Sequence, residues 1–146
     1  TISRSVFILA SQSDVFDAVT NWETQNKWIP FTKVVGVGTD SHKLGGKLEA
    51  YTGIGRVGFM DTMTITKLEP PFVCEVTHTG NFVKGSGLFE VSQDKDGSKF
   101  TWTEYFNLPS GILGNLAWAI VWIPTKVGLI ISMRKFAKHF LKILNY

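Results

Sequence analysis

Cysteine is nearly absent from this 146-residue sequence, since Cys74 is the only one. One thiol cannot form an internal disulfide, so we expect a reducing, cytoplasmic environment, and we interpret Cys74 as a buried small hydrophobic residue. Residues 1–10 lack the charged start and long apolar run of a signal peptide. No Cys/His cluster has zinc-site spacing, and we predict neither a metal nor a cofactor.

Motifs of several enzyme and binding classes are also missing. There is no P-loop lysine motif and no G-x-S-x-G nucleophile elbow. The spacing G-x-G-x-x-G occurs once, at Gly53–Gly58, but it lies between two strand patterns with no helix after it, which indicates a turn. Bases and aromatic residues do not interleave on one strand face, so we predict no nucleic-acid partner.

Acidic residues are absent after Glu104. The five bases beyond it give that part a charge of +5, so the rest carries −2 of the net +3; they are Lys126, Arg134, Lys135, Lys138 and Lys142. This basic face is either a solvated helix surface or an attraction for an anionic membrane surface or ligand. Ile112–Ile131 is mostly apolar, but Lys126 would be costly in lipid, so we do not expect a transmembrane span.

What the sequence has is an ordered series of strand and helix patterns. Ser11–Asp14 resembles a capping box, and it predicts a short helix with a second one at Trp22–Trp28. Apolar residues spaced by three and four predict a long amphipathic helix over Leu129–Leu144, which Pro124 should start or kink. Alternation and turn residues predict strands at Arg4–Ala10, Val34–Val37, Lys47–Ile54, Arg56–Leu68, Phe72–Gly80, Val83–Val91 and Ser98–Asn107.

This order predicts an α+β fold for residues 1–146 as a single domain. A curved antiparallel sheet of about seven strands would wrap around the long C-terminal helix, with the two short helices between its first two strands. The helix is the only large element available to cover the sheet, and the space between them is the expected ligand pocket.

Several segments carry a family resemblance over nearly the whole chain. They are ASQSDVFDAVTNWETQNKWIP at residues 10–30, Leu44-Gly45-Gly46, Glu69-Pro70-Pro71 and Phe100-Thr101-Trp102. The chain resembles the START-like helix-grip (SRPBCC) superfamily, which includes the polyketide cyclase/dehydrase and birch-pollen-allergen families. The resemblance implies a helix-grip fold that encloses lipids, sterols or polyketides, and it brings no shared catalytic residue set.

Strand alternation places three ionisable side chains on apolar faces. Asp61 shares a face with Phe59 and Met63; His78 shares one with Val76; Glu104 shares one with Trp102. These are the candidate acid–base residues if the protein is an enzyme; each could instead pair with another polar group or lie at the cavity mouth. Gly85 and Gly87 are expected to widen the interior.

The leading hypothesis is non-catalytic binding or carriage of a small hydrophobic ligand, such as a lipid, isoprenoid or polyketide. The alternatives are a polyketide cyclase, aromatase or dehydratase acting in the same cavity, and a membrane-surface or partner-binding module that uses the basic C-terminal helix. The sequence does not fix the oligomeric state. The predicted ligand-binding residues are Phe59, Met63, Val76, His78, Gly87, Phe89, Trp102, Glu104, Trp118, Met133, Phe136 and Ala137.

Overall fold

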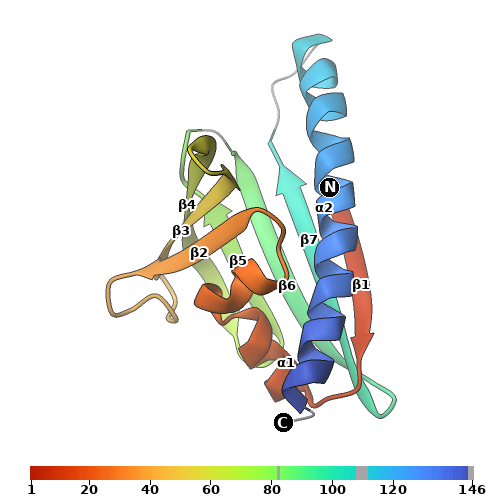
Figure 1. Ribbon diagram of the computed structural model, residues 1–146. Helices are drawn as coiled ribbons and strands as arrows, with labels where there is room; N and C mark the ends of the chain where they lie inside the picture. The colour runs from red at the N-terminus through yellow and green to blue at the C-terminus, as the bar shows by residue number, and fades with distance from the viewer. Residues whose placement is uncertain (82, 108–111, 145–146) are drawn as a thin grey trace.

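The computed structural model describes residues 1–81, 83–107 and 112–144, and within the last helix it describes the side chains of residues 122–140. Strands and helices follow one another in the predicted order (Figure 1). They are β1 (Ile2–Ile8), α1 (Gln12–Val19), the 3-10 helix η1 (Trp22–Lys27), β2 (Thr32–Val37), β3 (Lys47–Ile54), β4 (Val57–Glu69), β5 (Val73–His78), β6 (Gly85–Asp94), β7 (Gly97–Phe106) and α2 (Ile112–Leu144).

The seven strands form one antiparallel sheet in the order β1-β7-β6-β5-β4-β3-β2. Consecutive strands from β2 to β7 are neighbours, and β1 joins the edge beside β7, with Ile2 opposite Glu104. A register shift between Ile65 and Lys67 interrupts the β4–β5 pairing. The predicted α+β helix-grip architecture is confirmed.

The short helices are positioned by local signals that the sequence contains. The Ser11 hydroxyl accepts a hydrogen bond from the Asp14 backbone N–H at 3.1 Å, which caps α1 as predicted. The buried face of α1 consists of Val15, Phe16 and Val19. These residues hold α1 against the sheet, because burial of this face removes apolar surface from water.

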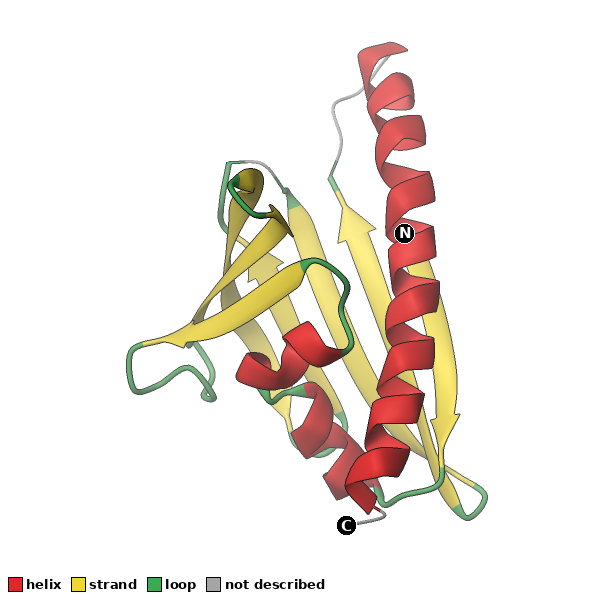
Figure 2. Ribbon diagram, in the orientation of Figure 1, coloured by secondary structure: helices red, strands yellow, loops and turns green. Residues whose placement is uncertain are grey.

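The core lies between the helices and one face of the sheet, as Figure 2 shows. Trp28 is at its centre, with ring centroids 5.0 Å from Phe136 of α2 and 6.2 Å from Phe100 of β7. The buried stripe of α2 is Leu129, Met133, Phe136 and Phe140, at the predicted spacing.

The structure excludes one of the two alternatives for Pro124, the start of the long helix. The long helix does not start at Pro124, since α2 begins at Ile112 and contains that proline. Proline removes its own N–H from the helix and crowds the preceding turn, and α2 nevertheless continues on both sides of it. Among the residues that the structure describes, no helix offers an apolar stretch long enough to cross a bilayer.

The other face of the sheet is rich in hydroxyl groups. Side-chain hydrogen bonds join Thr62 to Thr79 at 3.1 Å and Ser5 to Thr101 at 2.8 Å across neighbouring strands. The polar face explains why polar and apolar residues alternate along these strands. The residues between the hydroxyl-bearing positions therefore lie on the covered side of the sheet.

Candidate functional site

Two of the predicted ionisable residues meet on the covered face of the sheet. His78 is the last residue of β5, and it pairs with Met63 of β4, two positions from Asp61. This diagonal arrangement brings His78 Nδ1 to 2.6 Å from Asp61 Oδ2, a short hydrogen bond.

Glu104 reaches the same histidine from β7. Its Oε2 lies 3.5 Å from His78 Nε2, while the indole N–H of Trp102 donates to its Oε1 at 2.7 Å. Gly87 of β6 lies on the strand between those of His78 and Glu104. It pairs with Glu104 of β7 and with Val76 of β5. A Cβ at this glycine would lie 3.0 Å from Glu104 Oε1, so its missing side chain makes room for the carboxylate.

We call Asp61, His78 and Glu104 the polar cluster. The side chains of Asp61, His78 and Glu104 are 9%, 9% and 12% exposed, respectively. Among the residues that the structure describes, none forms a hydrogen bond with Asp61 Oδ1, His78 Nε2 or Glu104 Oε2, all three of which are buried; the last two atoms meet only as the 3.5 Å ion pair. Unpaired buried polar atoms are rare in native proteins and costly, which marks the cluster as a site where another group could bind.

The cluster holds His78 in its charged form at neutral pH. Burial is the largest single influence and would lower the pKa of the imidazole. The hydrogen bond with Asp61, the contact with Glu104 and the negative charges of both acids together outweigh it, and they raise the pKa of His78 to about 9. The result is an imidazolium between two acids, which can donate a proton to a bound molecule.

The other predicted ligand-binding residues are distributed between the core and the rim. Met133 and Phe136 are buried in the core, and Phe59 is 36% exposed on β4. The side chain of Trp118 lies outside the described residues. The remaining members pack, half-buried, against the core: Met63, Val76, Phe89, Trp102 and Ala137.

Cys74 is buried in the core, as the sequence indicates. Burial, with a smaller effect from the charge of Glu75, raises the pKa of its thiol to about 12. The neutral thiol is therefore not a nucleophile at physiological pH. Within the described part of the chain, no three His, Cys, Asp or Glu residues are arranged to hold a metal ion.

Sequence reasoning missed a hollow of about 420 Å³ beside α1. Phe16, Asp17, Trp22 and His42 are among its lining residues, and the rings of Trp22 and His42 stack 5.9 Å apart. Its members come from three segments with no shared pattern, so no periodicity could have indicated it. A second hollow, of about 730 Å³, lies where Gln12, Phe72, Glu90 and Lys99 meet, and neither hollow reaches the polar cluster.

Residues 1–130 match the sequence profile of the family described as "Polyketide cyclase / dehydrase and lipid transport". The chain belongs to this family. The match covers every strand and the first part of α2, so the polar cluster lies inside the family domain. No curated protein matched the sequence.

Solved structures of low sequence identity share the family fold. Protein NE0264 from Nitrosomonas europaea superimposes with a TM-score of 0.76 at 10% identity, covering 99% of this chain and 96% of its own. Protein TTHA0849 from Thermus thermophilus gives 0.76 at 10% identity, covering 97% of both chains. The Zhui aromatase/cyclase from Streptomyces sp. R1128 gives 0.72 at 11% identity, covering 94% of this chain and 91% of its own.

Proposed function

We propose that this member of the family binds a small, largely apolar molecule between the sheet and α2, with the polar cluster contacting its polar group. The observation that carries the proposal is the buried polar cluster in otherwise apolar surroundings, where Asp61 Oδ1 accepts no hydrogen bond from the described residues and His78 Nε2 meets Glu104 Oε2 only as an ion pair at 3.5 Å. A ligand that supplied a hydroxyl or carbonyl there would complete their hydrogen bonds.

The rest of the interior suits an apolar ligand body. Phe89, Trp102 and Met63 are half-buried side chains next to the cluster. Covering apolar surface of this kind contributes about 25 cal/mol per Å² before the costs of association. The family description, which names lipid transport, and the similarity to an aromatase/cyclase both support an enclosed apolar ligand.

Binding of a fluorescent fatty acid tests the proposal. We expect saturable binding to the wild-type chain, and about tenfold weaker binding to Ala137→Leu or Gly87→Leu, because the leucine fills space next to Glu104 at Gly87 and against the core at Ala137. Ser13→Leu, at an exposed position of α1, is the control. A wild-type chain that binds no apolar probe, and carries none through purification by native mass spectrometry, would rule out this function.

A second candidate function is acid–base catalysis on an enclosed substrate, which the position of His78 between two acids favours. In a dehydration, one carboxylate would take the proton beside a carbonyl while the imidazolium protonates the departing hydroxyl, so that water leaves. Such pairing of a base with an acid matches the chemistry named in the family description.

Variants of the cluster separate catalysis from binding. With a 3-hydroxyacyl thioester as the test substrate, Glu104→Gln should lower the rate of water loss by about a hundredfold while the fatty-acid probe still binds. Glu90→Gln, on an exposed position of β6, is the control. Equal rates in the two variants, or no turnover by the wild type, would leave binding alone as the function.

A further inference from the structure

The hairpin that joins β3 and β4 ends in exposed apolar side chains. Val57 is 82% exposed and Ile54 is 70% exposed, and the two are cross-strand partners at the turn. Phe31, 68% exposed, lies beside them, because its carbonyl accepts a hydrogen bond from the Gly53 N–H at 2.9 Å. We call Phe31, Ile54, Val57, Phe59 and Met60 the apolar tip; all five are exposed large hydrophobic residues.

The backbone at Phe31 is strained. Its φ of 56° lies in the left-handed region, which a bulky aromatic residue seldom adopts. Such a conformation costs of the order of 1–3 kcal/mol. Because the Phe31 side chain is exposed, its burial does not offset this conformational free energy. The exposed aromatic ring at Phe31 therefore lowers the stability of the folded chain.

Val57 and Phe59 of the apolar tip continue the face of β4 that carries the polar cluster, while Met60 lies on the opposite face. Alternate residues along the strand share this face, and their exposure falls inward from 82% at Val57 to 36% at Phe59 and 7% at Asp61. An apolar surface therefore runs from the end of the hairpin to the buried carboxylate. Figure 1 places the hairpin at the same end of the molecule as the first turns of α2 and the end of β7.

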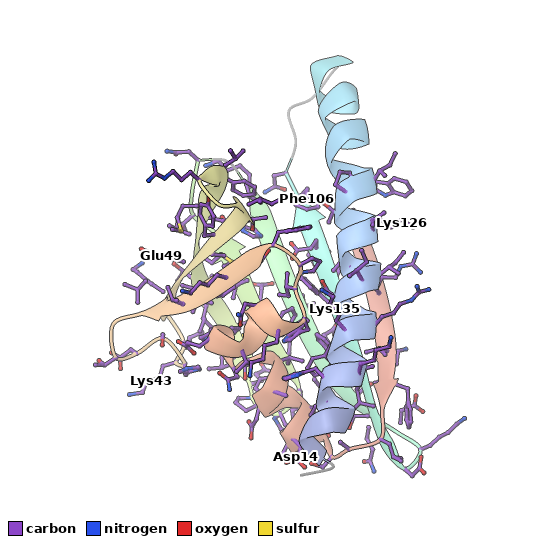
Figure 3. The ribbon with its side chains drawn as sticks, viewed as in Figure 1. Asp14, Lys43, Glu49, Phe106, Lys126 and Lys135 are labelled. Carbon is purple, nitrogen blue, oxygen red and sulfur yellow. The ribbon has the colours of Figure 1, made fainter. Side chains whose placement is uncertain are left out.

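The charges around the tip have one sign. Arg56 occupies the turn itself, between Ile54 and Val57, and no acidic residue occurs between Glu49 and Asp61. Lys33 of the adjacent strand β2 is exposed and pairs with Tyr51. Figure 3 shows Phe106, at the end of β7, and Lys126, on α2, toward the same end of the molecule.

We propose that the apolar tip docks on an anionic lipid bilayer, with Ile54 and Val57 entering the interface and Arg56 at the level of the headgroups. Exposed aliphatic and aromatic residues beside cations suit this interface, because the apolar groups leave water while the bases meet the negative leaflet. A protein partner would need a matching acidic and apolar surface. The inference is independent of which ligand the interior holds.

Vesicle flotation tests the docking surface. We expect the wild-type chain to float with vesicles of equal parts phosphatidylcholine and phosphatidylglycerol, and much less with phosphatidylcholine alone. Ile54→Ser/Val57→Ser should bind the anionic vesicles about tenfold more weakly. Val35→Ser/Val37→Ser is the matched control, since both valines are exposed, on β2 and away from the turn, with Glu49 opposite Val35.

A labelled variant gives a second readout that does not depend on the serine substitutions. Cys74 is buried, so Val57→Cys can be modified with the fluorophore NBD at the hairpin alone. We expect its emission to increase and shift to the blue with anionic vesicles, and this change to be lost at high salt.

Three results of the vesicle experiments would overturn the proposal, and a fourth would come from sedimentation. They are the absence of anionic-vesicle binding by the wild type, equal binding by the wild type and Ile54→Ser/Val57→Ser, and loss of binding only in Lys135→Glu/Lys138→Glu. The last outcome would assign the membrane contact to the basic face of α2. Self-association through the tip, seen as a concentration-dependent change in sedimentation that the serine variant abolishes without any lipid binding, would also reject it.

Discussion

Replacement of His78 by alanine is expected to lower the free energy of unfolding by about 3–5 kcal/mol at pH 7. The variant leaves Asp61 and Glu104 buried without the positive charge between them, and removal of one partner from a buried ion pair is strongly destabilising. Urea denaturation followed by circular dichroism measures the loss.

Two further variants make this prediction specific. His42→Ala should cost less than about 1 kcal/mol, because His42 is exposed and its stacking on Trp22 is its only described ring contact. His78→Ala/Glu104→Gln should be more stable than His78→Ala, since the second change removes a charge that has no partner. A double variant less stable than the single one would contradict the ion-pair account of the cluster.

The contribution of His78 to the stability of the wild-type chain is expected to fall by about 3 kcal/mol between pH 6 and pH 9.5. The pKa of His78 is about 9 in the folded chain and 6.5 without these neighbours, so the folded state holds this proton more tightly. The contribution is therefore fully present below pH 6.5, and it is lost as the pH rises through 9. Urea midpoints measured across this range give the slope.

The decisive control for the pH dependence is the same titration on His78→Ala, which should be nearly flat up to about pH 8.5. Above that pH the buried Cys74 adds a loss of its own, because the pKa of its thiol is raised to about 12 and the unfolded chain ionises first. A wild-type profile that is flat between about pH 6 and pH 8.5 would show that His78 is neutral in the folded state.

The strands were predictable because each obeys a local rule. Lys47–Ile54 has the observed bounds of β3, since turn residues flank an alternating pattern on both sides. β6 continues to Asp94, three residues beyond the prediction, because its pairing with β7 extends to the tight turn at Lys95 and Asp96. Such extensions depend on the partner strand, which a local pattern does not contain.

The polar cluster was predictable only in part. Alternation gave the inward direction of Asp61, His78 and Glu104, but their convergence depends on the register of four strands. The role of Gly87 also follows from this register, since it provides space for Glu104 and not simply a wider interior. The exposure of the apolar tip could not be predicted from the sequence either. A strand pattern does not indicate which part of the sheet the helix leaves uncovered.

The placement of β1 beside β7 has a consequence for synthesis of the chain. Ser3 and Thr103 share a hydrogen bond at 3.0 Å although 100 positions separate them. During synthesis β1 therefore stays without its β7 partner until the residues up to β7, about 100 positions later, have been translated. Only then can the sheet close and α2 settle on β1, so the nascent chain must keep an apolar edge from aggregation during that interval.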